Sequence, residues 1–189
     1  MPNPVTYNGY AMAIGGTIDG PSSAQTVSIY ERAAGSSAET LIGTTSATAY
    51  DGSLVFEFPL MQSFTTNTVF RVHVDGSGSS TAADQSLTLG VQAKVSLKSS
   101  ASKVTRGKSV KLTASVFPAS AAGGTVLFQQ QSGKSWKTLA TKKLAGSGSS
   151  AVASTSYKVS AGSHKLRLRY LGGTYNVATT SGTLSVTGR

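Results

Sequence analysis

The chain has 189 residues, of which 39% are hydrophobic and 13% charged, with 21 glycines and no cysteine. This length allows one or two domains, and the lack of cysteine excludes disulfides and thiolate metal sites. The first ten residues, MPNPVTYNGY, lack the basic and apolar regions of a signal peptide. No apolar run approaches the roughly 20 residues of a membrane-spanning helix, so we expect no membrane insertion.

The charges change sign near the middle of the chain. Residues 1–92 hold two basic and seven acidic side chains, a net charge of −5. Residues 93–189 hold fifteen basic side chains and no Asp or Glu. A charge step of this size at one point favours a domain boundary there. We therefore predict an acidic domain over residues 1–92 and a basic domain over residues 93–189.

The first half is a series of short strands separated by turns rich in Gly, Ser and Asp. Strands are predicted over residues 10–19, 26–31, 39–45, 53–60, 67–74 and 85–91. In the strand over 67–74, alternation places Phe70 and Val72 inward and Arg71 and His73 outward. Short alternating runs without a helical period are typical of an all-β sandwich.

The second half repeats this order of strands. A hairpin is predicted over residues 124–144, with its turn at Ser132, Gly133 and Lys134. Matching residues of the two halves are nearly evenly separated: Val27 and Val126 are 99 positions apart, and Arg71 and Arg167 are 96 apart. A constant offset of this kind indicates a tandem duplication.

Several motifs support a family resemblance. They are GKSVKLTASVFP, GTVLFQQQSGKSWKTLAT and AGSHKLRLRYLGG in the second half, and QTVSIYERAAGSSAETLIGTT and NTVFRVHVDG in the first. Both halves resemble the bacterial immunoglobulin-like (Ig-like) repeats found in secreted, cell-surface and bacteriophage structural proteins. The resemblance implies two tandem Ig-like β-sandwich domains of about seven strands each, which act as spacer, adhesive or decoration modules. It supplies no catalytic residues.

The residues offer little for catalysis or metal binding. His73 and His164 are the only histidines, and the second half has no carboxylate to join a metal site or a triad. We interpret both histidines as solvent-facing strand residues. The spacing of Asp75, Ser77 and Ser79 is weakly similar to a calcium loop but has no closing Glu. We expect no enzymatic activity, no cofactor and no metal. A Lys–Asn or Lys–Asp cross-link is also excluded, because the first half has no Lys and the second no Asp or Glu.

The basic face of the second half is the leading candidate site. Lys165, Arg167 and Arg169 alternate on one strand and are predicted to project from one face. Gln129 and Gln131 are expected beside them on the neighbouring strand, and Lys111 is predicted to point outward from the strand over 109–117. Fifteen cations without an anion attract polyanions at long range. The alternative is that these cations only keep a β surface soluble.

Several partners fit this charge. The candidates are an acidic protein surface, such as a capsid or filament subunit, and a cell-surface polyanion or glycan. Nucleic acid is a weaker candidate, because Tyr170 and Trp136 are expected to pack in the core and leave no exposed aromatic beside the cations. The opposite charges of the halves also allow head-to-tail self-association, which salt would weaken.

The sequence thus predicts a non-enzymatic structural or binding protein. Because the chain opens at Met without an export signal, we expect it on an assembled particle, as a phage virion decoration or a tail or capsid accessory protein. The alternative is a fragment of a secreted bacterial cell-surface adhesin or wall-binding protein, and an accessory module attached to an enzyme is a third interpretation. The localisation is accordingly the virion surface or the bacterial cell surface.

Overall fold

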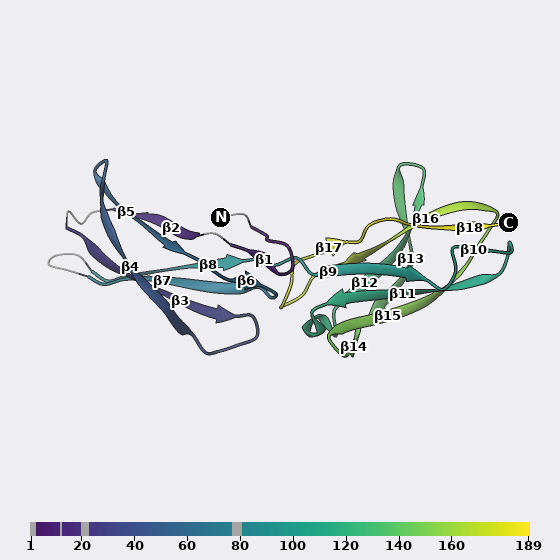
Figure 1. Cartoon of the computed structure of the whole chain (residues 1–189), viewed down its shortest axis with the longest axis horizontal. Helices are drawn as coiled ribbons and strands as arrows, with labels where there is room; N and C mark the ends of the chain where they lie inside the picture. The colour runs from purple at the N-terminus through teal and green to yellow at the C-terminus, as the bar shows by residue number, and fades with distance from the viewer. Residues whose placement is uncertain (1–2, 12, 20–22, 77–80) are drawn as a thin grey trace. The chain divides into compact units, whose positions relative to one another are not determined.

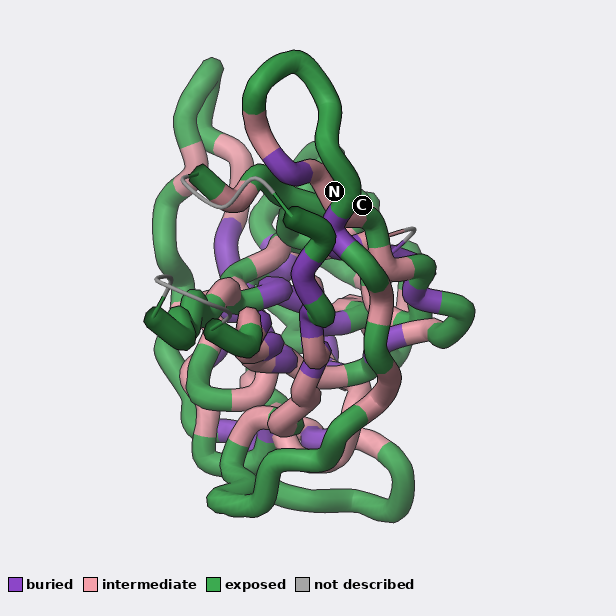
Figure 2. Tube along the Cα trace, turned by 90° about the vertical axis from the view of Figure 1, so that its left-hand side faces the viewer, coloured by how far each residue is buried: buried purple, intermediate pink, exposed green. Residues whose placement is uncertain are grey.

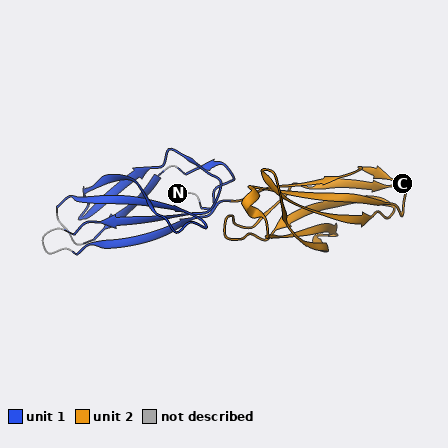
Figure 3. Cartoon of the chain, turned by 90° about the horizontal axis from the view of Figure 1, so that it is seen from below, with its two compact units in different colours: residues 1–91 blue, residues 92–189 orange. Residues whose placement is uncertain are grey.

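The computed structural model describes residues 3–11, 13–19, 23–76 and 81–189. In this part the chain is almost entirely β-strand, with one short 3-10 helix, η1 (Ala119–Ala121). The chain divides into two compact units, Met1–Val91 (unit 1) and Gln92–Arg189 (unit 2), which are coloured separately in Figure 3. Ser77 and Ser79, considered above for calcium, lie outside the described residues.

Unit 2 is a sandwich of two sheets (Figure 1). One sheet has the order β14-β15-β11-β9, and the other has the order β10-β18-β16-β12-β13, with β17 paired to β16. The strands are β9 (Lys94–Ser99), β10 (Lys103–Val104), β11 (Ser109–Phe117), β12 (Thr125–Ser132), β13 (Ser135–Lys143), β14 (Ala145–Ser147), β15 (Ser150–Lys158), β16 (Gly162–Tyr170), β17 (Thr179–Thr180) and β18 (Leu184–Gly188). This strand order is the Greek-key arrangement of an Ig-like domain.

Alternation along the strands builds the core of unit 2. On β11, Val110, Leu112, Ala114 and Val116 are all buried, as predicted, and they face the buried residues of the opposite sheet, such as Phe128. Figure 2 shows that buried positions alternate with half-buried and exposed ones along the trace of the chain. The core therefore lies between the two sheets, and every second side chain of a strand is left on an outer face.

Unit 1 has the same arrangement of strands, but its two layers are connected differently. Its strands are β1 (Gly9–Tyr10), β2 (Ala13–Ile18), β3 (Gln25–Ala33), β4 (Thr40–Tyr50), β5 (Ser53–Pro59), β6 (Ser63–Phe64), β7 (Thr68–Val74) and β8 (Ala83–Leu89). They form the order β2-β5-β4-β3-β7-β8, with β1 and β6 as a separate pair. The first part of β4 pairs with β3 and its last part with β5, so β4 joins the two layers. In unit 2 the equivalent run is divided into β13 and β14.

Equivalent irregularities occur in both units. The β3–β4 pairing shifts register between Ile29 and Tyr30, and the β12–β13 pairing shifts between Phe128 and Gln129. Such bulges redirect the side chains that follow them. The predicted hairpin turn after β12 is present, and Gly133 adopts φ +60° there. Glycine suits this left-handed conformation in a tight hairpin turn. Both units are Ig-like β-sandwiches, and the chain is an all-β protein.

Candidate functional site

The candidate site is the outer face of the β16-containing sheet of unit 2. Leu166 and Leu168 of β16 are fully buried in the core. Because successive side chains of a strand point to opposite faces, Lys165, Arg167 and Arg169 lie on the outer face. The predicted orientation of these three cations is confirmed. Lys165 and Arg169 are exposed, whereas Arg167 is half-buried.

Arg167 is held by its neighbour on β12. Gln129 lies directly opposite Arg167 in the β12–β16 register. The Nε–H group of Arg167 donates a hydrogen bond of 2.9 Å to Oε1 of Gln129. Gln129 is only 6% exposed, and its Nε2 also donates to Oγ1 of Thr138 on β13, at 3.4 Å. The buried amide of Gln129 is therefore hydrogen-bonded on both sides, and it holds the Nε edge of the Arg167 guanidinium in place.

Trp136 completes this arrangement from the third strand. The Cζ atom of Arg167 lies 4.1 Å from the centre of the Trp136 ring, which is a cation–π contact. The prediction that Trp136 packs in the core is wrong, whereas Tyr170 is buried as predicted, at 1% exposure. The physical reason is cross-strand pairing: Trp136 lies opposite Gln131, which is on the outer side of β12. The hairpin register was the signal that could have placed Trp136 correctly.

The other two predicted residues do not join this cluster. Gln131 is half-buried on β12, but its Nε2 donates to the backbone oxygen of Gly133 at 3.1 Å, so its amide is directed to the hairpin turn. Lys111 is exposed on β11, opposite Ser156 of β15. Since β11 and β15 belong to the other sheet, Lys111 faces the opposite side of the sandwich. The six predicted residues therefore do not form a single patch. We call Gln129, Trp136, Lys165, Arg167 and Arg169 the β16 face.

Unit 1 has the same arginine motif in a neutralised form. Arg71 lies opposite Tyr30, with its Cζ 4.0 Å from the ring centre. Its Nε is 2.9 Å from Glu39, and its Nη1 is 2.6 Å from Asp84. The hydrogen bond from Arg71 holds the pKa of Asp84 below its ordinary value, and the hydrogen bonds to Asp84 and Glu39 raise the pKa of Arg71. Two carboxylates thus balance the Arg71 charge.

Within its own unit, Arg167 has no side-chain carboxylate to neutralise its charge. Residues 92–189 contain no Asp or Glu, so no side-chain carboxylate of unit 2 is available to it. Its side-chain acceptor is the neutral amide of Gln129. A guanidinium that is fixed in place and not neutralised is suited to an external carboxylate, phosphate or sulfate, because its planar fork matches two acceptor oxygens. The chemistry available on this face is therefore anion recognition.

The histidines lie in polar networks, and the expectation that His164 faces solvent is wrong. His73 is half-buried between Asp84, at 3.0 Å, and Asp75, at 3.2 Å. His164 has the same parity on β16 as Leu166, which is buried, so it turns to the inner side of the sheet. There its ring meets the Tyr157 ring edge-on at 6.0 Å. Extending the alternation of β16 from Leu166 to His164 would have predicted this inward orientation.

His164 also lies 3.2 Å from the hydroxyl of Ser160, a distance compatible with a nucleophile and base. The surrounding hydrogen bonds argue against that role. The Tyr157 hydroxyl donates to Oε1 of Gln130, and Nε2 of Gln130 then donates to Nδ1 of His164. The remaining proton of a neutral ring is thus on Nε2, which donates to the Ser160 backbone oxygen at 3.0 Å. Ser160 faces an N–H group, which cannot accept its hydroxyl proton.

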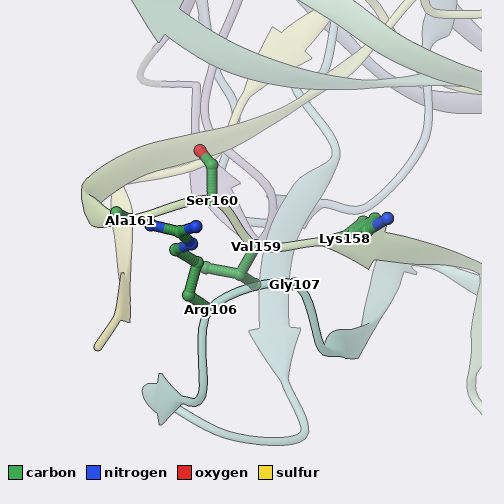
Figure 4. Close-up of a pocket in the computed structure, with 6 residues that line it drawn as sticks. All are labelled: Arg106, Gly107, Lys158, Val159, Ser160 and Ala161. Atoms are coloured by element: carbon green, nitrogen blue, oxygen red, sulfur yellow. The ribbon is translucent and has the colours of Figure 1, made fainter.

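A cavity of about 440 Å³ adjoins Ser160, between the Arg106–Gly107 and Lys158–Ala161 segments. Figure 4 shows that the Arg106 guanidinium lies beneath Ala161, whereas the Lys158 side chain is directed away from it. The two cations therefore do not converge on one point, and the cavity is not arranged as an anion clamp. We retain the β16 face as the site.

Among the described residues, no group of three or more His, Asp or Glu side chains is arranged to hold a metal ion. No helix in that part of the chain has the length and apolar character needed to cross a membrane. Ig-like β-sandwiches are typical of binding and structural modules.

Comparison with known proteins leaves the particular family open. No family model matches the chain, and no curated protein is similar to it in sequence. Among solved structures, the chain is similar to one described as an amphioxus IgVJ-C2 molecule, with 15% sequence identity and a TM-score of 0.38. The match covers 97% of this chain and 99% of the other. The Ig-like assignment therefore depends on the strand order described above.

Proposed function

We propose that the chain is a non-enzymatic binding protein that attaches to an anionic surface through the β16 face of unit 2. The observation that carries the proposal is the setting of Arg167. This guanidinium lies over Trp136 and is hydrogen-bonded to Gln129, as Arg71 lies over Tyr30, but the carboxylates that neutralise Arg71 have no equivalent in unit 2. Lys165 and Arg169 on either side extend the charge along the strand.

The partner that we propose is an acidic protein surface on an assembled particle, such as a phage capsid or filament subunit. Carboxylates presented on a repeating surface match the guanidinium fork and the flanking cations. The acidic unit 1 remains available for a separate contact, including head-to-tail association with a second copy. The virion surface as the setting is an inference from the resemblance of the sequence motifs.

A polyanionic glycan of a bacterial cell surface is the second candidate, in which the chain belongs to a secreted adhesin or wall-binding protein. The half-exposed ring of Trp136 favours it, because an aromatic ring beside cations offers both an apolar and a charged contact. Nucleic acid remains the weaker candidate. Trp136 removes the objection that no aromatic lies beside the cations, but single-strand binding uses several stacked bases.

A charge-matched pair of variants tests the β16 face. The triple variant Lys165→Gln, Arg167→Gln and Arg169→Gln removes three cations from the face. The control variant Lys98→Gln, Lys108→Gln and Lys111→Gln removes three exposed cations from elsewhere in unit 2. Binding to a surface coated with poly-L-glutamate, measured by surface plasmon resonance, reports the affinity of each.

We expect the first triple variant to lose at least about tenfold more affinity than the control, because a preformed guanidinium contributes more than net charge. Equal losses in the two variants would show that net charge alone drives binding, and the proposed face would be wrong. Replacing poly-L-glutamate by heparin compares a carboxylate polypeptide with a polyanionic glycan. Electron microscopy of the native source then shows whether the protein lies on a regular particle or on the cell envelope.

A further inference from the structure

The first and second units differ at one edge of the sandwich. In unit 2, β9 pairs antiparallel with β11 and covers its outer edge. Val95 and Leu97 of β9 pack against the hydrophobic core, whereas Lys94 and Lys98 are exposed. β9 therefore closes this side of unit 2 with its apolar residues inward and its basic residues outward. Figure 1 shows β9 beside β11.

In unit 1, β2 occupies the position that β11 has in unit 2. β2 pairs with β5 as β11 pairs with β15. It is the terminal strand in the sheet order of unit 1, so among the described residues no strand covers its outer edge. The backbone of the middle of β2 is accessible, since Gly15 and Gly16 are exposed.

The open edge is accompanied by an apolar groove of about 370 Å³ between β2 and β8. Its apolar lining includes four half-buried side chains that pack on the core of unit 1 from different strands, namely Ile18, Phe56, Val74 and Leu87. In unit 2 the corresponding side of the core is covered by β9. The groove is thus the place that a further strand would fill.

The composition of β2 is unusual for an exposed edge. Proteins protect such edges with charged residues, especially Lys, or with proline, which oppose pairing with another chain. β2 has the sequence AIGGTI and contains neither. Two edge strands of unit 2 are protected in this way, since β9 carries Lys94 and Lys98 and β13 carries Lys137, Lys142 and Lys143. The outer edge of β2 is therefore competent to pair with an added strand.

We propose that this groove of unit 1 binds an extended segment of a partner protein, which pairs antiparallel with β2 and alternates apolar and basic residues. Addition of a strand to an open sheet edge is a general mode of peptide recognition, in which backbone hydrogen bonds give affinity and alternate side chains fill pockets. The apolar side chains enter the groove as Val95 and Leu97 enter the core of unit 2.

Charge complementarity specifies the basic residues of this partner. Asp19 and Asp84 line the groove and both are exposed, although Asp84 is already paired with Arg71. The whole of unit 1 has seven acidic residues against Arg32 and Arg71. A segment with outward-facing Lys or Arg is therefore attracted, and an acidic segment is repelled. β9, which has this pattern, is already paired with β11 and is not available to fill the groove. This binding uses unit 1 and is independent of the β16 face.

A synthetic peptide with the sequence of residues 93–100, AKVSLKSS, is a suitable probe. We would label it with fluorescein and titrate it with the full chain, following fluorescence anisotropy. A control peptide has serine at the positions of Val95 and Leu97, which keeps the charge and removes the apolar side chains. We expect saturable binding of the first peptide, and binding of the control at least about tenfold weaker. Equal binding of both peptides would overturn the proposal.

Two matched variants locate the binding on the chain. Ile18→Lys places a cation in the groove, whereas Ile42→Lys makes the same change at a half-buried isoleucine that packs on the same core outside the groove. Ile18→Lys is expected to weaken peptide binding at least about tenfold, and Ile42→Lys less than about twofold. Equal effects of the two variants would contradict the groove as the site.

Hydrogen exchange of the unmodified chain tests strand addition without any variant. If the peptide pairs with β2, the backbone amides over residues 13–18 exchange more slowly in its presence. Unchanged exchange there would overturn the proposal even if the peptide binds. Sedimentation of the chain alone tests the other occupant: a dimer that Ile18→Lys disperses and Ile42→Lys does not would mean that a second copy fills the groove, and the proposed partner would be wrong.

Discussion

The guanidinium carbon of Arg167 lies 4.1 Å from the centre of the Trp136 ring, and its Nε–H group donates to Gln129 at 2.9 Å. The side chain is therefore held from two strands before any ligand arrives. Less side-chain entropy is lost when a preorganised group of this kind binds. The same position of unit 1 holds Arg71 over Tyr30, where Glu39 and Asp84 already take the charge.

Trp136 is the only tryptophan of the chain, so under native conditions the tryptophan fluorescence reports on the surroundings of this contact. We predict that heparin or poly-L-glutamate changes the Trp136 emission of the unmodified chain and that the change is lost in Arg167→Gln. The reason is that a bound anion must displace or reorient the guanidinium above the ring. Arg71→Gln is the matched control, because it removes an arginine from the equivalent position of unit 1. A full response in Arg167→Gln would contradict the assignment.

Acid is expected to destabilise unit 1 through Asp84. The hydrogen bond from Arg71 lowers the pKa of Asp84 below its ordinary value of 3.8. A carboxyl group whose pKa is lowered by folding stabilises the fold at pH values above 3.8, and this stabilisation is lost as the pH falls through the lowered pKa. Unit 2 has no side-chain carboxylate, so it lacks this contribution.

The measurement is acid titration followed by amide signals in nuclear magnetic resonance spectra, which separate the two units. We expect the signals of unit 1 to be lost at a higher pH than those of unit 2. In Asp84→Asn the acid-dependent component is expected to shrink, whereas Glu57→Gln, which changes another exposed carboxylate of the unit, leaves it in place. Simultaneous loss of both units in the unmodified chain would count against the Asp84 mechanism.

Substitutions at buried and at exposed positions of β16 should differ sharply in their effect on the stability of unit 2. Leu168→Ala removes a fully buried side chain of β16 and is expected to lower the free energy of unfolding of unit 2 by about 2–5 kcal/mol. Lys165→Ala on the exposed side of the same strand should change it by less than about 0.5 kcal/mol. Urea denaturation followed by Trp136 fluorescence gives both values. Similar values for the two variants would mean that the alternation of β16 is assigned incorrectly.

The β12–β13 turn depends on the backbone conformation of one glycine. Gly133 has φ +60°, and a Cβ there would meet no atom within 4 Å, so a substitution is opposed by backbone strain alone. We predict that Gly133→Ala lowers the free energy of unfolding by about 1–2 kcal/mol. Gly182→Ala is the control, because that position is equally open and its φ is not in this region. Comparing the thermal unfolding of the two variants separates the effect of backbone strain at Gly133 from the effect of adding a methyl group.

Much of the fold could be predicted from local patterns. The alternation in β11 and β16 identified the buried residues Leu112 and Leu168, since a strand places every second side chain on one face. The outward orientation of Arg167 followed from the same rule, and its neighbour Gln129 followed from the expected pairing of β12 with β16. The candidate site was incomplete, however, because the sequence analysis placed Trp136 in the core.

The sequence by itself determined the charge of each unit, the strand positions and the direction of most side chains, because charge and period-two alternation are local properties. The tertiary structure decided most of the strand pairings and the register of each. It placed Trp136 over Arg167, put Lys111 on the opposite sheet and left the edge of β2 uncovered. These features depend on pairing between residues far apart in the chain, and similar alternating strands are compatible with many pairings until the whole core selects one.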